Sequence, residues 1–600
     1  MQPTRYQITP LDPHAHLFEV RCTVDDPDPA GQRFRLPAWI PGSYLVREFA
    51  RQFIDVRSES GDGPVALHKE AKDTWRAAPA RGPLTLVARV YAFDLSVRTA
   101  YLDATRAYFN GPSVFLCPHG RAEAPCTLDI VAPEGAAYEQ WRVATTLATD
   151  GAPTHGFGRY RAEDYDTLID HPVEIGDFAL ASFAAGGAHH EIALTGRHDA
   201  DLERLARDLA RLCQWQIDFF GDVPQSRAPF DRYLFQITCV GEGYGGLEHR
   251  SSTSLLCKRD ELPMRGREEI TDDYLHFLGL ASHEYFHAWN VKRIKPAAFV
   301  PYDLAREGYT RQLWAFEGIT SYYDDLALVR CGLIGPARYL ELLGQAISNV
   351  LRTPGRHVQS IAEASFDAWI KFYRQDENSP NAGISYYAKG SLVALALDLT
   401  LRKSARGSLD AVMRILWDRY GRSGVGVPEG VVAQIASEVA GSDMQPFFDR
   451  FVDGTEDPPL ASLLDAFGVD WHLRATSGAS DRGGKPVQGV APACWFGAKI
   501  GSDQALQHVF SGGPAERAGL AARDVLVALD GLRASTDTMN ALLARRGPGE
   551  RIRVHAFRRD ELLDVDVELV AAPLDTCYLT LRGDVAPPAL ALRSAWLTGA

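Results

Sequence analysis

Across the first 185 residues, hydrophobic and polar positions alternate in short runs. Examples are Tyr6–Thr9, His16–Val24 and Leu84–Ala92, and clusters of proline, glycine and aspartate separate them. A period of two is typical of strands with one buried face, and frequent turn residues keep such strands short. The pattern therefore predicts an N-terminal all-β domain, a β-sandwich, over residues 1–185.

From about residue 199 the period of the pattern lengthens. Residues 201–221 repeat apolar side chains at intervals of three and four, which predicts an amphipathic helix. A strand pattern follows at 232–240, and several long helical patterns occupy about 268–452. We therefore predict a mostly helical domain with a small sheet over residues 186–460.

The C-terminal part returns to β patterns. Residues 475–486 are polar and glycine-rich, as in a linker, so we assign 461–487 to a connecting segment. Short strand patterns around the segment 511–531 predict a β-module over 488–573, followed by a tail over 574–600. The fold class is therefore multidomain α+β, because one hydrophobic core rarely serves 600 residues.

Composition and charge narrow the class of protein. Hydrophobic residues make up 46% of the chain and charged residues 23%, as in ordinary globular proteins. The net charge is −14 and basic residues are scattered, so neither nucleic acid nor membrane is expected as a partner. The nine cysteines contain no CxxC pair, which suits a reducing compartment.

The N-terminal segment and the lengths of the apolar runs bear on the cellular location of the protein. The first residues show no basic segment followed by an apolar stretch, and no apolar run reaches the ~18 residues of a membrane span. We therefore expect a cytoplasmic protein, with a periplasmic location left open if a leader has been removed.

A zinc-binding motif is the most specific chemical signal in the chain. His283, Glu284 and His287 form the sequence HExxH within a helical pattern that Thr271 or Asp272 caps. Residues four apart lie one turn above each other, so both imidazoles can bind one zinc ion at about 2.0–2.1 Å. Glu284 is about 100° further round the helix, where it can act on a water without being a ligand. The alternative is a chance match in which both histidines are core residues.

A catalytic zinc ion needs a third protein ligand. Glu317 lies thirty residues after His287, in a second helical pattern whose neighbours Trp314 and Phe316 indicate a buried face. A buried carboxylate needs a cation or strong hydrogen-bond donors, so we predict Glu317 as the third ligand of one zinc ion per chain. Glu307 is the rival, but its neighbours are typical of a surface loop.

A glycine-rich segment precedes the zinc motif. Gly241, Gly243 and Gly246 satisfy the pattern GxGxxG of dinucleotide-binding loops. That interpretation requires a helix to begin at the third glycine, whereas the sequence continues with a polar, strand-like segment. The pattern therefore does not indicate a nucleotide site.

Four segments in this order resemble the gluzincin aminopeptidases. They are GGLEH (245–249), HEYFHAWN (283–290), LWAFEG (313–318) and YAKG (387–390). The closer resemblance is to the PDZ-containing glycyl aminopeptidase family, which also shows PAWIPGSYLVREFAR (37–51), SFDAWIKFYR (365–374) and a C-terminal PDZ domain. It covers nearly the whole chain and implies a thermolysin-like catalytic domain over 186–460.

The resemblance also implies roles for individual residues. Glu248, with Gly246 beside it, matches the site that binds the free α-ammonium group of a peptide substrate, and Tyr387 matches the tyrosine that stabilises the oxyanion. Tyr386 is adjacent and stays an alternative to Tyr387. Leu247 and His249 depart from the family's GAMEN pattern, so the resemblance does not fix the shape of the first pocket. The resemblance further implies a preference for N-terminal glycine or alanine.

The resemblance assigns the β-module over 488–573 to a PDZ-like domain. Trp495–Ala498 sits where such domains bind a peptide C-terminus, although a purely structural module is an alternative. The function expected is that of a zinc aminopeptidase in which Glu284 is the general base. The alternatives are a zinc endopeptidase and an inactive PDZ-based peptide-binding protein.

Overall fold

The computed structural model describes residues 2–221, 226–478, 480–486 and 492–599. The chain divides into two compact units. The first comprises Met1–Gly308 with Trp417–Val427, and the second comprises Tyr309–Leu416 with Pro428–Ala600. No helix in the described ranges is both long enough and apolar enough to cross a membrane.

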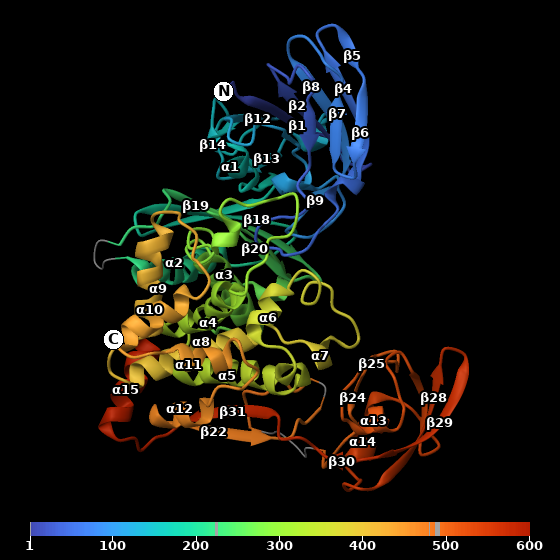
Figure 1. Ribbon diagram of the computed structural model, residues 1–600, viewed down its shortest axis with the longest axis vertical. Helices are drawn as coiled ribbons and strands as arrows, with labels where there is room; N and C mark the ends of the chain where they lie inside the picture. The colour runs from blue at the N-terminus through green and yellow to red at the C-terminus, as the bar shows by residue number, and fades with distance from the viewer. Residues whose placement is uncertain (1, 222–225, 479, 487–491, 600) are drawn as a thin grey trace. The chain divides into compact units, whose positions relative to one another are not determined.

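The N-terminal part of the first unit is β-rich, as the alternating pattern predicts, and is drawn in blue to cyan in Figure 1. An eight-stranded sheet has the order β14-β15-β12-β1-β2-β8-β4-β5, and two four-stranded sheets have the orders β13-β16-β10-β9 and β11-β3-β7-β6. The strands and one short helix are β1 (Thr4–Asp12), β2 (Leu17–Val24), β3 (Arg33–Arg35), β4 (Phe53–Ser60), β5 (Gly63–Val65), β6 (Leu67–Ala71), β7 (Thr74–Ala77), β8 (Leu84–Tyr91), β9 (Ala100–Leu102), β10 (Arg106–Phe109), β11 (Cys117–Pro118), β12 (Cys126–Ile130), β13 (Arg142–Ala144), β14 (Ala148–Thr149), β15 (Gly158–Ala162), α1 (Tyr165–Ile169) and β16 (Val173–Gly176).

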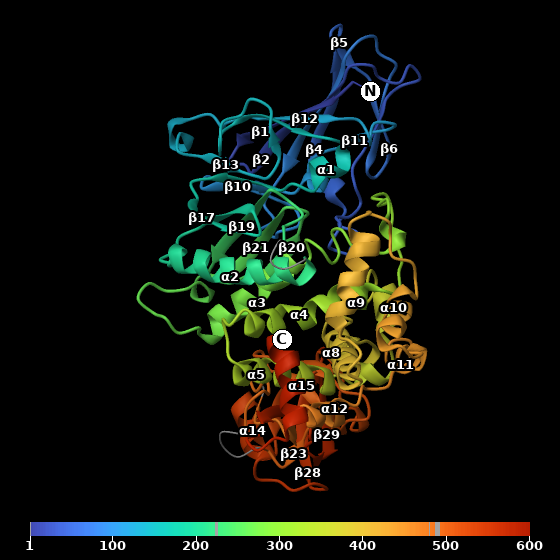
Figure 2. The ribbon, with the colours of Figure 1, turned by 90° about the vertical axis from the view of Figure 1, so that its left-hand side faces the viewer.

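A five-stranded sheet completes the first unit. Its order is β17-β18-β19-β21-β20, and β18, β19 and β21 run parallel while β20 pairs antiparallel at one edge. The helices α2 and α3 lie along one side of this sheet (Figure 2). The elements are β17 (Ala179–Ala185), β18 (Ala188–Thr195), α2 (Leu202–Phe220), β19 (Arg232–Val240), β20 (Gly245–Glu248), β21 (Ser252–Lys258) and α3 (Asp272–Phe286).

Local sequence signals account for these elements. The predicted helix over 201–221 is α2, which begins after Asp201, whose carboxylate accepts a hydrogen bond from Arg204 N at 3.0 Å. The predicted strand at 232–240 is β19. Gly246, the third glycine of the GxGxxG pattern, lies in a strand rather than opening a helix. The predicted domain boundary at residue 185 falls in the turn between β17 and β18.

The second unit is mostly helical up to residue 466. Its helices are α4 (Ile319–Arg330), α5 (Pro336–Leu351), α6 (Ile361–Phe366), α7 (Ser379–Ala382), α8 (Ala388–Lys403), α9 (Leu409–Leu416), α10 (Val431–Ala440), α11 (Gln445–Phe451) and α12 (Leu460–Ala466). A two-stranded ladder of β22 (Val469–Arg474) and β31 (Thr576–Leu581) packs on α5, and α15 (Pro587–Thr598) ends the chain.

The C-terminal β-module has a hydrophobic core of its own, which includes Phe496, Leu529 and Val554. Its elements are β23 (Cys494–Trp495), β24 (Ala498–Ile500), β25 (Leu506–Val509), α13 (Pro514–Arg517), β26 (Val525–Leu529), β27 (Leu532–Arg533), α14 (Thr536–Leu543), β28 (Arg551–Arg558), β29 (Glu561–Glu568) and β30 (Val570–Ala571). The predicted boundary at 487 and 488 lies outside the described residues. Membership of the PDZ class stays a prediction.

Helix α15 is docked into the helical core of the second unit. Trp596 is fully buried, and its indole Nε1 donates to the Tyr322 hydroxyl at 3.0 Å. Arg330 donates to the carbonyl of Trp596 at 2.7 Å, and Arg402 donates to that of Ala595 at 2.8 Å. Two guanidinium groups therefore satisfy carbonyls in the last turn of the helix, where the macrodipole favours positive charge.

Removing the Trp596 side chain tests this docking. Because a large buried aromatic side chain is lost, we expect Trp596→Ala to lower the free energy of unfolding by about 3–5 kcal/mol. Urea denaturation measures the change. Leu590→Ala, on the same helix but 48% exposed, is the control and should cost about 0.5 kcal/mol or less. Equal effects of the two substitutions would contradict the docking.

Candidate metal centre and substrate site

The HExxH motif lies at the C-terminal end of α3. The helix begins after Thr271, whose hydroxyl accepts a hydrogen bond from Tyr274 N at 3.1 Å. Of the two N-cap residues that the sequence offered, Thr271 and Asp272, the structure has Thr271. His283 is in the last turn, and His287 follows the helix with its N–H bonded to the His283 carbonyl at 3.3 Å. The two rings therefore lie one turn apart in an edge-to-face arrangement, with centroids separated by 4.6 Å and an interplanar angle of 86°.

The ring of His287 is held by a backbone carbonyl. Its Nδ1 lies 2.5 Å from the carbonyl oxygen of Asn290, so that nitrogen is the donor and Nε2 is left as the ligand atom. A hydrogen bond of this kind fixes the tautomer and the orientation of a metal-binding histidine.

Glu317 lies in an unusual turn of helix. Residues Trp314–Gly318 form a π-helical turn directly before α4, and turns of this type are frequent at functional sites. Glu317 is 2% exposed. A Cβ added to Gly318 would lie 2.7 Å from the Cα of Gly390, which shows how closely this turn approaches the start of α8.

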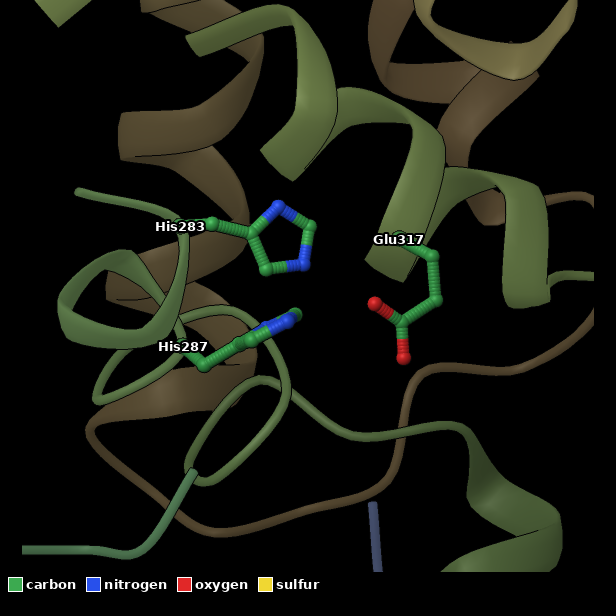
Figure 3. Close-up of side chains that lie close together, drawn as sticks. All are labelled: His283, His287 and Glu317. Carbon is green, nitrogen blue, oxygen red and sulfur yellow. The ribbon is translucent and has the colours of Figure 1, made fainter. Parts of the chain in front are cut away.

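The structure brings the three predicted metal ligands together (Figure 3). One ligand atom from each of His283, His287 and Glu317 lies within 4.8 Å of the other two, and the Glu317 carboxylate points toward the imidazole rings. Two imidazoles and one carboxylate are the donor set that a catalytic zinc ion takes. These residues therefore fit a zinc ion, and in the described part of the chain the rival Glu307 does not join the group. Binding itself stays a prediction.

Edge strand β20 presents its alternate residues to two different environments. Leu247 is fully buried in the core of the N-terminal β-rich part. Gly246 faces Glu284, because a Cβ added to this glycine would lie 2.0 Å from Glu284 Oε1. Arg98 donates to the Gly246 carbonyl at 3.1 Å and so fixes this stretch of the edge.

Glu248 is a buried carboxylate at the end of the same strand. It is 3% exposed, and its Oε1 accepts no hydrogen bond from any described residue. An unsatisfied buried carboxylate oxygen is costly and therefore demands an explanation. A cation bound from solution would satisfy it.

A charged cluster next to Glu248 went unrecognised in the sequence. Lys292 lies 2.6 Å from the Asp170 carboxylate, and His249 Nδ1 lies 3.5 Å from it, with all three residues buried. Burial opposes ionisation, but Lys292 and Arg250 hold the pKa of the Asp170 carboxyl well below its usual range. No spacing signal could have revealed this cluster, because residues 170, 249 and 292 belong to separate segments.

The two candidate tyrosines differ in access to solvent. Tyr386 is fully buried, and burial, with smaller contributions from Tyr373 and Glu317, raises its pKa well above the usual value. Tyr387 is half-buried, and its hydroxyl lies 3.3 Å from that of Tyr373. Tyr373 belongs to the 365–374 motif, to which the sequence assigned no chemical role.

The lysine of the YAKG segment is structural. Lys389 is fully buried, and its ammonium donates to the carbonyls of Arg356 at 3.0 Å and Thr455 at 2.9 Å. It therefore anchors the start of α8, and with it the neighbouring Tyr387.

Metal titration tests the three predicted ligands. Zinc at about 100 times its dissociation constant should add about 2.7 kcal/mol to the unfolding free energy of metal-depleted protein, because it binds only the folded state. Thermal unfolding with and without zinc measures this gain. His287→Ala and Glu317→Ala should abolish it, whereas Glu307→Ala should retain it. An unchanged gain in Glu317→Ala would exclude that residue as a ligand.

Comparisons with known proteins extend the argument to the whole chain. A model of the Peptidase M61 N-terminal domain matches residues 5–177, and a model of the M61 glycyl aminopeptidase matches 276–393. The solved aminopeptidase N family protein from Idiomarina loihiensis is 40% identical, with a TM-score of 0.94 over 99% of this chain and 100% of that one.

A more distant similarity links the chain to an M1 zinc metallopeptidase from Deinococcus radiodurans. Identity is 14% over 76% of this chain and 95% of that one, and the TM-score is 0.48, so nothing further is inferred from it. None of the curated proteins compared with the chain is significantly similar to it.

The family resemblance noted in the sequence is thus confirmed. A relative that shares 40% of its residues across nearly the whole chain, and two family models that match in order, lead to one conclusion. The chain belongs to the M61 glycyl aminopeptidase family and is a metallopeptidase.

Proposed function

We propose that the protein is a zinc-dependent aminopeptidase that removes one residue, preferably glycine or alanine, from the N-terminus of peptides. One observation carries the proposal: Glu248 offers a buried, unsatisfied carboxylate oxygen on the strand that touches Glu284. An endopeptidase would leave this carboxylate without a cation, whereas the α-ammonium group of a peptide would neutralise it.

The spacing on β20 suits release of a single residue. Gly246 contacts Glu284, and Glu248 lies two residues further on the same face of the strand. Two strand residues span about 6.6 Å. One aminoacyl residue is at most about 3.6 Å long, so a backbone spacing of this size favours a single residue between the ammonium site and Glu284.

His283, His287 and Glu317 would hold the zinc ion. When bound, the ion supplies Lewis acidity, which acidifies water and polarises the scissile carbonyl. Glu284 accepts the proton of the attacking water at its carboxylate and returns it to the leaving amine. Glu284 is 6% exposed, so its carboxylate is largely shielded from bulk solvent.

Tyr387 donates its hydroxyl hydrogen bond to the oxyanion that develops on the scissile carbonyl. It is supported over Tyr386 because it is half-buried while Tyr386 is fully buried. One such donor contributes about 3 kcal/mol to stabilisation of the transition state in a site that excludes water.

The preference for glycine or alanine rests on membership of the family. It is to be tested with a panel of N-terminal residues on one chromogenic leaving group.

The C-terminal β-module has a strand edge that a peptide could pair with. Strand β24 follows Gly497, whose φ is +84°, and in the described sheet it pairs only with β25, through one of its two edges. We propose that a peptide C-terminus adds to the other edge, as in β-augmentation. This step is independent of the aminopeptidase chemistry.

The role of Glu248 is tested with a pair of substrates. A peptide with a free N-terminus and its N-acetylated twin are compared by kcat/KM, and the wild type should cleave only the free form efficiently. Glu248→Ala should lose about 10²–10³-fold on the free peptide, because a charge-assisted contact worth about 3–4 kcal/mol disappears. Equal cleavage of both peptides by the wild type would instead favour the endopeptidase.

The contact between Gly246 and Glu284 is tested by adding one methyl group. Gly246→Ala places Cβ 2.0 Å from Glu284 Oε1, so the carboxylate must move, and we expect kcat to fall about 10²-fold at unchanged zinc content. Gly245→Ala is the matched control, because its Cβ would meet Arg98 at an ordinary 3.5 Å. If both variants kept wild-type kcat, Glu284 would not need its present position.

A further inference from the structure

A loop of the N-terminal β-rich part reaches the Glu248 carboxylate. Gly42 lies in the turn closed by the hydrogen bond from Ser43 N to the Ile40 carbonyl at 3.0 Å, and its φ is +92°. A Cβ added to Gly42 would lie 2.5 Å from both carboxylate oxygens of Glu248. The backbone of Gly42 therefore packs directly against the end of that side chain.

The loop is held in place from both sides of Gly42. Before it, the indole of Trp39 donates to the carbonyl of Asp303 at 2.9 Å. After it, the ring of Tyr44 stacks on Phe299 with centroids 5.7 Å apart and an interplanar angle of 18°. Trp39 and Tyr44 are each 1% exposed. These contacts hold the loop in place, so the backbone of Gly42 has a fixed position next to Glu248.

We propose that Gly42 is a positioning residue for Glu248. Because glycine has no side chain, the Glu248 carboxylate can lie against position 42, and this position sets where the substrate's α-ammonium group is bound. This inference rests on the proposed role of Glu248. With Gly42 against both of its oxygens, the carboxylate cannot move toward the loop, and its Oε1 accepts no hydrogen bond from the described chain.

The expected size of the effect follows from the contact distance. A Cβ at 2.5 Å must become a contact of roughly 3.4 Å, so the carboxylate has to shift by about 1 Å. A misplacement of about 1 Å in a catalytic site costs about 10²-fold in rate. Because the atoms that must move end a flexible side chain, the fold can tolerate the change.

Gly42→Ala is therefore compared with Gly63→Ala. Gly63 lies in the same β-rich part with a φ of +110°, but a Cβ there would meet no atom within 4 Å. Both variants carry the same kind of backbone strain, and only Gly42→Ala displaces a carboxylate. We expect kcat/KM on a free alanyl peptide to fall about 10²-fold in Gly42→Ala and less than about threefold in Gly63→Ala, at equal zinc content.

Coupling to Glu248 separates positioning from a general structural defect. In a double-mutant cycle, Gly42→Ala should add little loss to a Glu248→Ala background, because its effect passes through the removed carboxylate. The ratio of cleavage of free to N-acetylated peptide should fall in Gly42→Ala as it does in Glu248→Ala. Additive losses, or a Gly42→Ala variant that behaves like Gly63→Ala, would overturn the proposal.

The proposal can still be tested if the Gly42→Ala variant does not fold. If Gly42→Ala does not fold, the double variant Gly42→Ala/Glu248→Ala must regain the thermal midpoint of Gly63→Ala, and failure to regain it overturns the proposal. The proposed function fails separately, when Glu248→Ala alone keeps the wild-type preference for a free N-terminus.

Discussion

Burial of negative charge is the constraint on which the chemistry of this protein depends. Glu248, Glu284 and Glu317 are 3%, 6% and 2% exposed, and a carboxylate taken out of water is strongly destabilising unless a positive group compensates it. In the proposed mechanism each has a different compensating partner. A zinc ion would compensate the charge of Glu317, the substrate's ammonium group that of Glu248, and the proton of the attacking water that of Glu284. The free protein is therefore built to be completed by its metal and its substrate.

Close approach of glycine backbones holds two of these carboxylates. Gly246 lies against Glu284 and Gly42 lies against Glu248, at distances that leave no room for even one methyl group. A carboxylate at the end of a flexible side chain loses rotamer freedom when backbone closes one side of it. Gly246 of the GGLEH segment and Gly42 of the PGSY segment can thus be explained by contact with carboxylates. The same closeness joins Gly318 to Gly390 and ties the turn of Glu317 to the start of α8.

Local signals in the sequence were enough to predict some of the elements and the three candidate metal ligands. The helix of residues 201–221 and the strand of 232–240 follow from periodicity and capping alone, because both signals act between neighbours in the chain. The HExxH motif is equally local, since one turn of helix sets the spacing of its histidines. Glu317 was predicted from its apolar neighbours, and Figure 3 shows its carboxylate beside the two imidazoles.

Tertiary structure alone decided how the carboxylates are held. The contact of Gly42 with Glu248 joins positions 206 residues apart, and the cluster of Asp170, His249 and Lys292 joins three separate segments. Likewise, nothing in the adjacent letters Tyr386 and Tyr387 tells which ring is buried; the packing at the start of α8 decides it. Periodicity and motifs report interactions between residues within a few turns or strands, whereas these contacts depend on which distant segments the fold brings together.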